Sequence, residues 1–449
     1  MDTKQILETT LKEANSFLNR IDVVNPNIPF NIEINQKLNK EGIGFENTLN
    51  RFKKDYEPYI SGTAGPRYFG YVVGGATSAS LAGDWLTSVY DQVSPASQVA
   101  SVHEKHTITL LLELFNLPNS FTGTLVSGAT VSNMLNLAIA RQWYGLQLGI
   151  DIAKNGMYGI KKINVLSANA HSSSYKGFSI LGIGRDSLIK VKTLPNSECT
   201  DVNDLEEKLK SLSGEPAIVL SSAGTVNTTA FDNFKLIENL KTSYNFWHHI
   251  DGAFGGFASC TDDYAHLVDG WEMADSITID AHKWMNIPYD SAFQFTKRID
   301  LQQQVFQNGN APYVKDLGDF SLINLTPQAS RRWRSLPVWF SLLTYGKNGY
   351  KTLIEQNCKQ AKILGSFIEK SNNFELLAEV NLNTVCFRVS PNRLKTTQEF
   401  LIELNNTGKV FLTPTSYAGG YAIRCAICNW QTKNEDIELL IQEIEKINL

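Results

Sequence analysis

Lys283 stands at the end of an apolar, strand-like run and has the surroundings of a nucleophile. The run comprises residues 275–284 (DSITIDAHKW) and places the lysine between His282 and Trp284. Burial favours the neutral form of an amine, and a neutral amine can attack an aldehyde to form a Schiff base. The alternative is a lysine at the rim of a strand whose ammonium group lies in water.

A carboxylate in a matching position is Asp251, within the segment FWHHIDGAFGG (246–256). This segment reads as a short apolar strand that runs into a glycine-rich turn, so Asp251 is expected at the carboxyl end of a strand, where open α/β sheets build their sites. Side chains alternate along a strand, so His249 and Asp251 share one face. A carboxylate there can keep the ring nitrogen of pyridoxal phosphate protonated. The alternative is a solvated aspartate at a strand end.

Two further segments offer groups for a phosphate and a flat ring. The turn TLVSGATVSN (124–133) opens a predicted helix, whose N-terminus presents unpaired N–H groups to an anion. Gly128 and Ala129 let the backbone approach, and Thr130 can donate a hydroxyl, although the same residues also make an ordinary helix cap. In SANAHSS (167–173), His171 follows an apolar strand and is positioned to stack on a ring, whereas a single histidine is more often structural.

Together these segments resemble the pyridoxal-phosphate-dependent group II amino-acid decarboxylases, the family of the aromatic amino-acid and glutamate decarboxylases. The resemblance covers about residues 66–436 and is most specific in the pattern Asp-x-His-Lys-Trp with the upstream His-x-Asp-Gly-Ala. It implies a fold-type I α/β architecture, pyridoxal 5′-phosphate as the cofactor and an L-amino acid as the substrate. It also implies a homodimer with active sites at the subunit interface.

The resemblance implies a role for each matching residue. Lys283 would bind the cofactor covalently, Asp251 would pair with the pyridine nitrogen, and His171 would stack on the ring and approach the substrate carboxylate. Tyr313 matches the family's loop tyrosine and would donate a proton to the decarboxylated carbon; the alternative is a solvent-exposed tyrosine. The remaining expected cofactor contacts are Ala129, Thr130, Thr225, Ala253, Asp280 and His282. Family members often have Asn-Pro or Asp-Pro before the His-Lys pair, where this chain has Asp-Ala.

Residues 66–77 (PRYFGYVVGGAT) resemble the family segment that borders the substrate pocket, although relatives carry a side-chain hydroxyl near the position of Gly74. Arg67 is the only nearby candidate for an acidic substrate. The aromatic residues of the segment favour an aromatic or large apolar substrate; they are Tyr68, Phe69 and Tyr71.

Arginines farther along the chain are open to several interpretations. Arg331 and Arg332, in SRRWRSLP (330–337), resemble a family signature in which a lysine stands where this chain has Pro337. They fix the preceding loop or stabilise the dimer, or they form a basic, solvated turn. Arg424 is expected to be structural, although related aminotransferases bind a carboxylate with such an arginine.

The periodicity of apolar residues predicts the elements that position these groups. Helices are expected at 3–20 and 45–59 and over much of 81–118, and strands alternate with helices from 123 to about 295. This alternation predicts a mostly parallel sheet with crossover helices. Residues 305–330 read as a long loop. Beyond it, helices at 350–369 and 435–447 and strands at 385–389 and 422–426 predict a smaller α+β unit.

We therefore expect an N-terminal helical dimerisation segment (1–65), a large cofactor-binding domain (66–345) and a small C-terminal α+β domain (346–449). The 449 residues exceed what one core usually holds. The apolar stripe of the first helix packs on a second subunit or, alternatively, on the chain's own body.

The composition, with 43% hydrophobic and 19% charged residues, is typical of a globular protein. The net charge of −4 gives no reason to expect nucleic acid or an anionic membrane as a partner. No run is long enough to span a membrane, and the N-terminus lacks a leader pattern. The six cysteines form no disulfide framework, and Cys425 and Cys428 lack the second pair of a zinc site. A cytoplasmic protein without a metal is expected.

Three functions remain open. An α-decarboxylase, which releases an amine and carbon dioxide, is favoured because residue 313 is tyrosine; relatives with phenylalanine there tend toward oxidative aldehyde formation. An aminotransferase, an aldehyde synthase or a carbon–carbon lyase on the same scaffold is the second possibility, and release of a keto acid would distinguish transamination. The third is a non-catalytic relative, against which the joint presence of His171, Asp251 and Lys283 argues.

Overall fold

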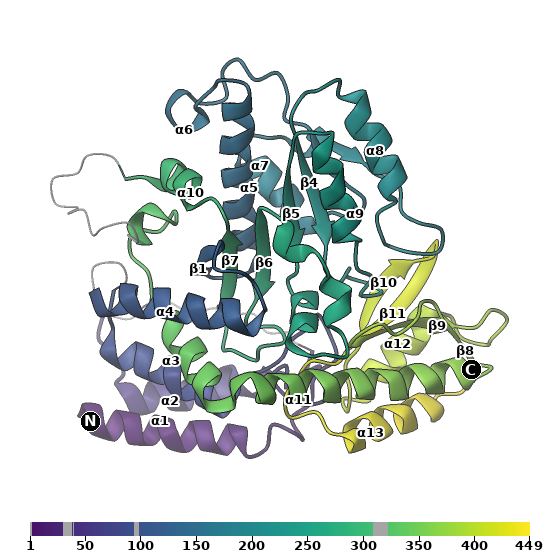
Figure 1. Cartoon of the computed structure of the whole chain (residues 1–449). Helices are drawn as coiled ribbons and strands as arrows, with labels where there is room; N and C mark the ends of the chain where they lie inside the picture. Colours follow the sequence, from purple (N-terminus) through teal and green to yellow (C-terminus); the bar gives the residue numbers. More distant parts are fainter. Residues whose placement is uncertain (1, 30–37, 39, 94–97, 309–321) are drawn as a thin grey trace.

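A seven-stranded sheet forms the centre of the computed structural model, which describes residues 2–29, 38, 40–93, 98–308 and 322–449 (Figure 1). The order across the sheet is β1-β7-β6-β5-β4-β2-β3. Only β7 runs antiparallel to its neighbours. The predicted α/β fold with a mixed, mostly parallel sheet is therefore confirmed. The strands are β1 (Thr122–Val126), β2 (Val165–Ser167), β3 (Leu188–Lys190), β4 (Ala217–Ser222), β5 (Phe246–Asp251), β6 (Ser276–Asp280) and β7 (Ala292–Thr296).

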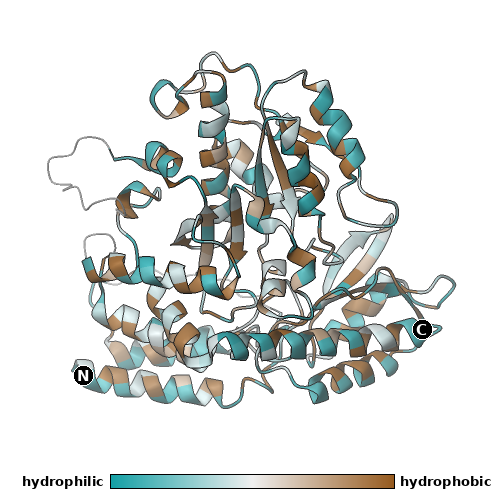
Figure 2. Ribbon diagram, viewed as in Figure 1, coloured by the Kyte–Doolittle hydropathy of each residue, from teal (hydrophilic) through white to brown (hydrophobic). Residues whose placement is uncertain are grey.

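Helices connect and cover these strands. Among the helices between β1 and β7, the longest is α5 (Ala129–Gln147). It packs against β5, β6, β7 and α7. Figure 2 shows hydrophobic residues concentrated in the strands of the large sheet, whereas the surrounding helices carry hydrophilic residues on their outer sides. The other helices of this region are α6 (Ile152–Asn155), α7 (Ser172–Ile180), α8 (Val202–Ser211), α9 (Phe234–Asn239) and α10 (Ile299–Phe306).

A smaller antiparallel sheet, in the order β10-β11-β9-β8, lies in the C-terminal part of the chain beside α12 (Thr397–Asn406) and α13 (Asn434–Glu445). This arrangement agrees with the expected α+β unit. Its strands are β8 (Phe374–Leu376), β9 (Thr384–Val389), β10 (Thr413–Tyr417) and β11 (Gly420–Ala426).

The long helix α11 (Ser335–Lys370) runs along the bottom of Figure 1 and joins the two sheets. It begins at Ser335, 15 residues before the predicted helix start at 350. Pro337 does not prevent this start, because it lies in the first turn, where a missing N–H costs no hydrogen bond. At Gly346 the backbone has φ 58° and ψ −175°, which breaks the helix at the boundary we expect between the large and small domains.

Helices α1 (Thr3–Leu18), α2 (Phe45–Asp55), α3 (Ser78–Tyr90) and α4 (Gln98–Leu114) lie together on one side of the molecule (Figure 1). The predicted helix at 45–59 is interrupted after Asp55, since Pro58 disfavours a helical residue before it, and a 3-10 turn follows at Glu57–Tyr59. Neither α1 nor α2 contains a buried residue. No helix among the described residues is long and apolar enough to cross a membrane.

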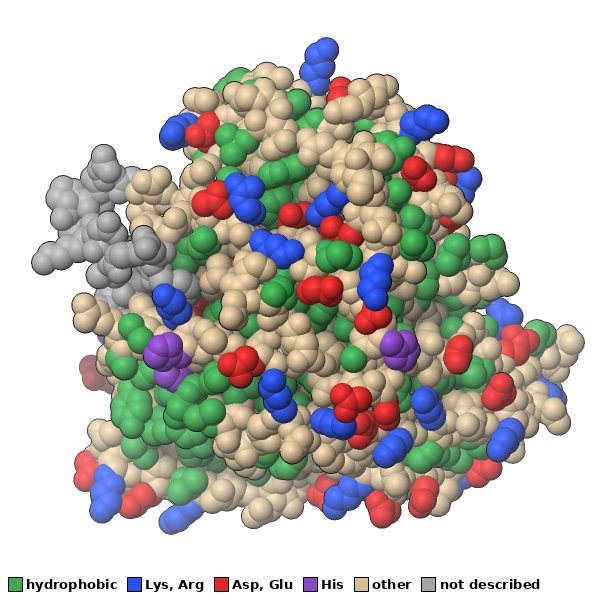
Figure 3. All heavy atoms as spheres, viewed as in Figure 1, with side chains coloured by type: hydrophobic (Ala, Val, Ile, Leu, Met, Phe, Trp, Pro, Cys, Tyr) green, Lys and Arg blue, Asp and Glu red, His purple; other side chains and the backbone are tan. Residues whose placement is uncertain are grey.

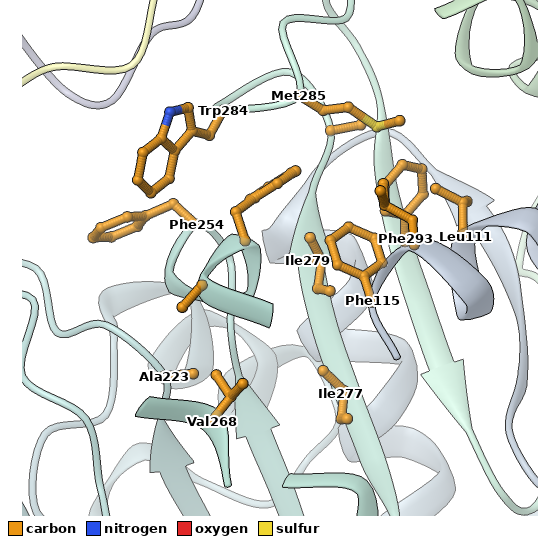
Figure 4. Close-up of a cluster of buried hydrophobic side chains, with 14 of the residues drawn as sticks. Leu111, Phe115, Ala223, Phe254, Val268, Ile277, Ile279, Trp284, Met285 and Phe293 are labelled. Carbon is orange, nitrogen blue, oxygen red and sulfur yellow. The ribbon is translucent and has the colours of Figure 1, made fainter. Parts of the chain in front are cut away.

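A buried hydrophobic cluster surrounds the end of β6 (Figure 4). Ile277 and Ile279 point from the strand into this cluster, and Trp284 and Met285 continue it beyond Lys283. The indole N–H of Trp284 also donates a hydrogen bond of 2.9 Å to Asn357 Oδ1 in α11. Lys283 is therefore held between two rigidly packed stretches of chain.

Candidate active site

The ends of three strands meet at one cavity of about 490 Å³. Lys283 follows β6, Asp251 ends β5, and His171 lies beyond β2 as the N-cap of α7; all three line the cavity. These strands are parallel, so their carboxyl ends lie at the same edge of the sheet, as the sequence predicted. The structure thus brings the three residues together, although the first and the last of them, His171 and Lys283, are 112 residues apart in the chain.

The Nζ atom of Lys283 lies 3.2 Å from Oδ2 of Asp280, and the lysine side chain is 20% exposed. The other carboxylate oxygen, Oδ1, accepts a hydrogen bond of 2.8 Å from the backbone N–H of Ala129 and lies 3.4 Å from His282 Nε2. Asp280 holds the lysine, the histidine and the start of α5 together.

Asp251 has both carboxylate oxygens hydrogen-bonded by nitrogen donors. Asn133 Nδ2 donates to Oδ2 over 2.8 Å, and the backbone N–H of Ala253 donates to Oδ1 over 3.1 Å. His249 bonds the same asparagine, with 2.9 Å between its Nε2 and Asn133 Oδ1. The expected common face of His249 and Asp251 is therefore confirmed. A carboxylate oxygen accepts more than one hydrogen bond, so Asp251 can also accept one from a protonated ring nitrogen at the cavity.

His171 is exposed to the cavity, and its Nδ1 faces α7. The backbone N–H of Ser173 donates to Nδ1 over 3.2 Å, and Ser173 Oγ lies 2.8 Å from the same atom. Because a backbone N–H can only donate, Nδ1 is an acceptor, and the proton of the neutral ring is on Nε2. Desolvation by the surrounding protein lowers the pKa of His171, so the neutral ring predominates at pH 7.

The N-terminus of α5 provides only part of the expected phosphate-binding site. Gly128 is its N-cap, with no capping side chain, and a Cβ at Gly128 would stand 3.4 Å from His282 Cε1. Ala129 lines the cavity, whereas Thr130 is exposed and is not among the lining residues. The N–H of Ala129 is already bound to Asp280, so a phosphate here would use the other N–H groups of the first turn.

Thr225 and Ala253 line the cavity as expected, but the hydroxyl of Thr225 has a protein partner. It donates to Glu198 Oε2 over 2.6 Å. The same carboxylate accepts hydrogen bonds from Thr228 and from Asn227 Nδ2, at 2.8 Å each from their side chains. Glu198 thus fixes the turn at residues 225–228 and itself contributes to the cavity wall.

The arginine singled out for an acidic substrate is the wrong one. Arg67 does not line the cavity; its Nε donates to Asp436 Oδ1 in α13 over 2.8 Å. Arg424, on β11, does line it. Arg424 is 7% exposed, burial lowers its pKa, and its Nε has no hydrogen-bond partner among the described residues. Its guanidinium group therefore contributes an incompletely paired positive charge to the cavity wall.

Of the aromatic residues of segment 66–77, one lines the cavity and two do not. Tyr71 lines the cavity, whereas Tyr68 stacks on Phe411 with ring centroids 4.8 Å apart and Phe69 belongs to the core of the smaller sheet. Tyr71 and Val72 have φ values of 55° and 64°. Such angles are strained for a tyrosine and more so for a β-branched valine, and strain of this kind concentrates at functional sites.

Arg331 is buried, so the interpretation as a basic, solvated turn is wrong for this residue. Its guanidinium group pairs with Glu104 at 3.1 Å, with both side chains fully buried, and also donates to the carbonyl of Leu125. Arg332 pairs with Asp84 in α3 at 2.6 Å. Both arginines therefore fasten the start of α11 to the chain's own helices. Tyr313 lies outside the described residues.

Several residues that line the cavity or support it, as Asn133 supports Asp251, carry no motif in the sequence. Asn133 lies four residues after Ala129, one helical turn away on the same face of α5, and this spacing could have drawn attention to it. Glu198 and Lys190 come from segments without any motif. Arg424 was noticed, but only the structure shows that it reaches the cavity.

Comparisons with known proteins agree with this geometry. The model of the pyridoxal-dependent decarboxylase conserved domain matches residues 31–390. Tryptophan decarboxylase TDC2 from Camptotheca acuminata is 27% identical over 413 residues, which cover 85% of this chain and 80% of that protein. An aromatic-L-amino-acid decarboxylase from Bacillus atrophaeus is 25% identical over 401 residues, with 85% and 81% covered.

A solved structure has the same fold over the whole chain. The crystal structure of Oryza sativa TDC with PLP and tryptamine superposes with a TM-score of 0.92 at 20% identity, covering 100% of this chain and 98% of that one. The amine, the ring-facing carboxylate and the partly open helix N-terminus described above fit pyridoxal phosphate. The chain belongs to the pyridoxal-dependent decarboxylase family and is a pyridoxal-phosphate-dependent enzyme of that family.

Proposed function

We propose that this enzyme decarboxylates an aromatic L-amino acid to the corresponding amine and carbon dioxide, with Lys283, Asp251 and His171 as its central groups. The observation that carries the proposal is the convergence of these three residues on one cavity. Bound pyridoxal phosphate supplies an aldehyde for amines and a ring that withdraws electrons from a bond at Cα. The protein selects which bond breaks by orienting the substrate.

Each residue has a distinct role in this proposal. Lys283 would hold the cofactor through its amine, and Asp280, 3.2 Å from Nζ, keeps that amine beside the cavity. Asp251 keeps the ring nitrogen protonated. His171 stacks on the ring and presents Nε2–H as a donor to the substrate carboxylate. The cofactor contacts that we propose are Ala129, Thr130, Thr225, Ala253, Asp280 and His282. The hydroxyl of Thr225 is held by its hydrogen bond to Glu198.

Arg424 is the group that we assign to the substrate's negative charge. It is a cation in a poorly hydrated cavity wall, and its Nε has no hydrogen-bond partner among the described residues. Burying a cation without a partner is costly, so a carboxylate in the cavity would be bound strongly. Glu198 lines the same wall and disfavours a second negative charge on the substrate.

An aromatic side chain is favoured by the apolar residues of the cavity, among them Tyr71, Val72 and Phe254. The names of the two relatives, at 25% and 27% identity, point the same way. Tyr313 would donate the proton to Cα after carbon dioxide leaves. A relative named phenylacetaldehyde synthase, from Petunia hybrida, is also 27% identical, so aldehyde formation is the main competing outcome.

We also propose that the enzyme is a homodimer with active sites at the subunit interface. Hydrophobic side chains gather over the helices at the lower left of Figure 3, the region of α3, α4 and the first turns of α11. Exposed residues there include Trp85, Val89, Val99, Val102 and Leu343. Apolar patches of this kind on a soluble protein usually mark an interaction site. Sedimentation analysis of the protein and of the Val89→Glu/Val102→Glu variant tests the dimer.

A cytoplasmic location is supported by the six cysteines, none of which forms a disulfide. Expression of the chain with a fluorescent tag, followed by fractionation, tests this part. Recovery from the periplasmic or membrane fraction would contradict it.

A substrate panel tests the reaction itself. The protein loaded with pyridoxal phosphate is incubated with L-tryptophan, L-tyrosine, L-phenylalanine, L-glutamate and L-cysteine sulfinate, and carbon dioxide, amine, keto acid, aldehyde and peroxide are measured. We expect carbon dioxide and amine in equal amounts from an aromatic substrate. A keto acid without carbon dioxide would replace the proposal with transamination, and aldehyde with peroxide would replace it with aldehyde synthesis.

A further inference from the structure

A chain of buried hydrogen bonds connects two residues that line the cavity, Asp251 and His171. It runs through Asn133, a fully buried residue in the second turn of α5. Asn133 Nδ2 donates to Asp251 Oδ2 over 2.8 Å and to Ser173 Oγ over 3.0 Å. Ser173 in turn bonds Nδ1 of His171. One amide group therefore contacts Asp251 directly and His171 through a single hydroxyl.

The directions of the hydrogen bonds in this chain follow from Asp251, whose carboxylate can only accept. The NH₂ group of Asn133 therefore faces Asp251, and Asn133 Oδ1 faces His249 Nε2. The indole N–H of Trp247 can only donate, and it does so to Ser276 Oγ over 3.0 Å. The hydroxyl hydrogen of Ser276 is then free to donate to Nδ1 of His249, 2.9 Å away. The neutral His249 ring consequently carries its proton on Nε2 and donates to Asn133 Oδ1.

The partners of the Asn133 amide follow from the same reasoning. Its Oδ1 accepts from His249, and its NH₂ group donates to Asp251 and Ser173, with one N–H for each. Ser173 Oγ accepts from Asn133 and donates its own hydrogen to His171 Nδ1. Burial lowers the pKa of His249 to about 4, so this arrangement is stable at neutral pH.

We propose that Asn133 is a positioning residue that fixes the orientation of the Asp251 carboxylate and keeps the His171 ring with its proton on Nε2. It acts through these two residues and does not line the cavity itself. The geometry leaves His171 Nε2–H directed away from α7 as a donor for a substrate carboxylate. The inference depends on cofactor binding by this site and not on the aromatic substrate, so failure of the substrate proposal leaves its tests unaffected.

The chain offers a closely matched control in Asn136, three residues farther along α5. It is also fully buried and also uses both ends of its amide, donating to the Ile277 carbonyl over 3.3 Å and accepting from Gln294 Nε2 over 2.8 Å. None of its partners lines the cavity. Loss of Asn136 should therefore weaken the packing of α5 on the sheet without changing Asp251 or His171.

The first test compares Asn133→Ala with Asn136→Ala in the full-length protein. The affinity for pyridoxal phosphate is measured by titration of the apoprotein, and the ring ¹⁵N shifts of selectively labelled histidine report the tautomers. We expect about tenfold weaker cofactor binding and altered His171 and His249 shifts in Asn133→Ala only, since a charge-assisted hydrogen bond is lost at Asp251. Equal cofactor affinity and unchanged histidine shifts in both variants would overturn the inference.

A second variant keeps the inference testable if Asn133→Ala does not fold. Asn133→Asp has nearly the same shape and still accepts from His249, but it places a second carboxylate against Asp251. At high pH the two carboxylates repel, and at low pH a shared proton restores the hydrogen bond. We expect cofactor affinity, relative to wild type, to be at least tenfold lower at pH 8 and to recover toward pH 5.5. A constant ratio across this range, as expected for Asn136→Asp, would contradict the proposed role.

Discussion

Gly74 packs its Cα directly against the carbonyl oxygen of Lys283. A Cβ at this position would overlap that oxygen and would stand 2.8 Å from Nδ2 of Asn286. Relatives in the family carry a side-chain hydroxyl near this position, but here the backbone of segment 66–77 lies too close to the lysine to admit any side chain. The position of Lys283 therefore depends on a glycine that comes from a distant part of the chain.

The first prediction follows from this contact. Gly74→Ala should destabilise the protein by about 1–3 kcal/mol, the usual cost of overpacking, and should lower the affinity for pyridoxal phosphate because Lys283 is displaced. Urea unfolding and cofactor titration measure the two effects. The control is Gly42→Ala, since a Cβ at Gly42 meets no atom within 4 Å and should change neither quantity. Wild-type cofactor affinity in Gly74→Ala would show that the contact does not position the lysine.

Arg424 provides a prediction about substrate binding. Arg424→Met should raise KM for the substrate by about 10- to 100-fold, the range expected on losing a hydrogen bond to a charged group. Arg67→Met is the matched control, because Arg67 pairs with Asp436 and does not line the cavity. Steady-state kinetics with both variants separate the two roles. If Arg424→Met loses stability but keeps its KM, the arginine is structural, as the sequence suggested.

How much of this site could be predicted is clear from individual residues. Lys283, Asp251 and His171 follow apolar strands, and residues at the carboxyl ends of parallel strands necessarily meet, so local pattern was sufficient to bring them together. Arg67 was misassigned because its partner, Asp436, lies 369 residues away and leaves no local signal. The burial of Arg331 leaves no local signal either, because its partner Glu104 lies 227 residues away.

The fold shows the same division between local and long-range information. Helix α1 and the strands of the large sheet follow directly from apolar periodicity. The sequence places the start of α11 too late, because Pro337 and Gly346 break the helical pattern of its first half, which is held by contacts with α3 and α4. Glu198 reaches the cavity only through the packing of its loop against residues 225–228.

The reaction outcome provides the third prediction. Tyr313→Phe removes one hydroxyl, so cofactor and substrate binding should persist while amine formation slows by about 10²–10⁴-fold, the contribution of a positioned acid. Part of the substrate would instead be oxidised by molecular oxygen, with release of carbon dioxide, aldehyde, ammonia and hydrogen peroxide. Amine, aldehyde and peroxide are measured together. Amine formation at the parental rate without peroxide would mean that Tyr313 is not the proton donor.

Acid sensitivity gives a fourth prediction, which concerns stability. Burial lowers the pKa of His249 from 6.5 to about 4. Between these values the unfolded chain binds a proton that the folded chain does not, so this histidine reduces stability by about 1.4 kcal/mol for each pH unit below 6.5, down to pH 4. Above pH 6.5 this histidine does not change the stability, since its side chain is neutral in both the folded and the unfolded chain.

Urea unfolding of wild type and His249→Gln between pH 7.5 and 4.5 measures this effect. The variant should lose stability less steeply than wild type below pH 6.5, whereas His103, whose pKa is also lowered to about 4, contributes equally to both proteins. Parallel curves throughout the range would show that His249 is protonated in the folded state.

The most direct test of the account is to identify the lysine that binds the cofactor. Among the residues that the structure describes, two lysines line the cavity, Lys283 and Lys190. The protein loaded with pyridoxal phosphate is reduced with borohydride, digested, and its peptides are analysed by mass spectrometry. We expect a reduced cofactor attached to Lys283 alone, and no attachment or turnover in Lys283→Ala, which should still fold. A cofactor found on Lys190, or substantial activity in Lys283→Ala, would contradict it.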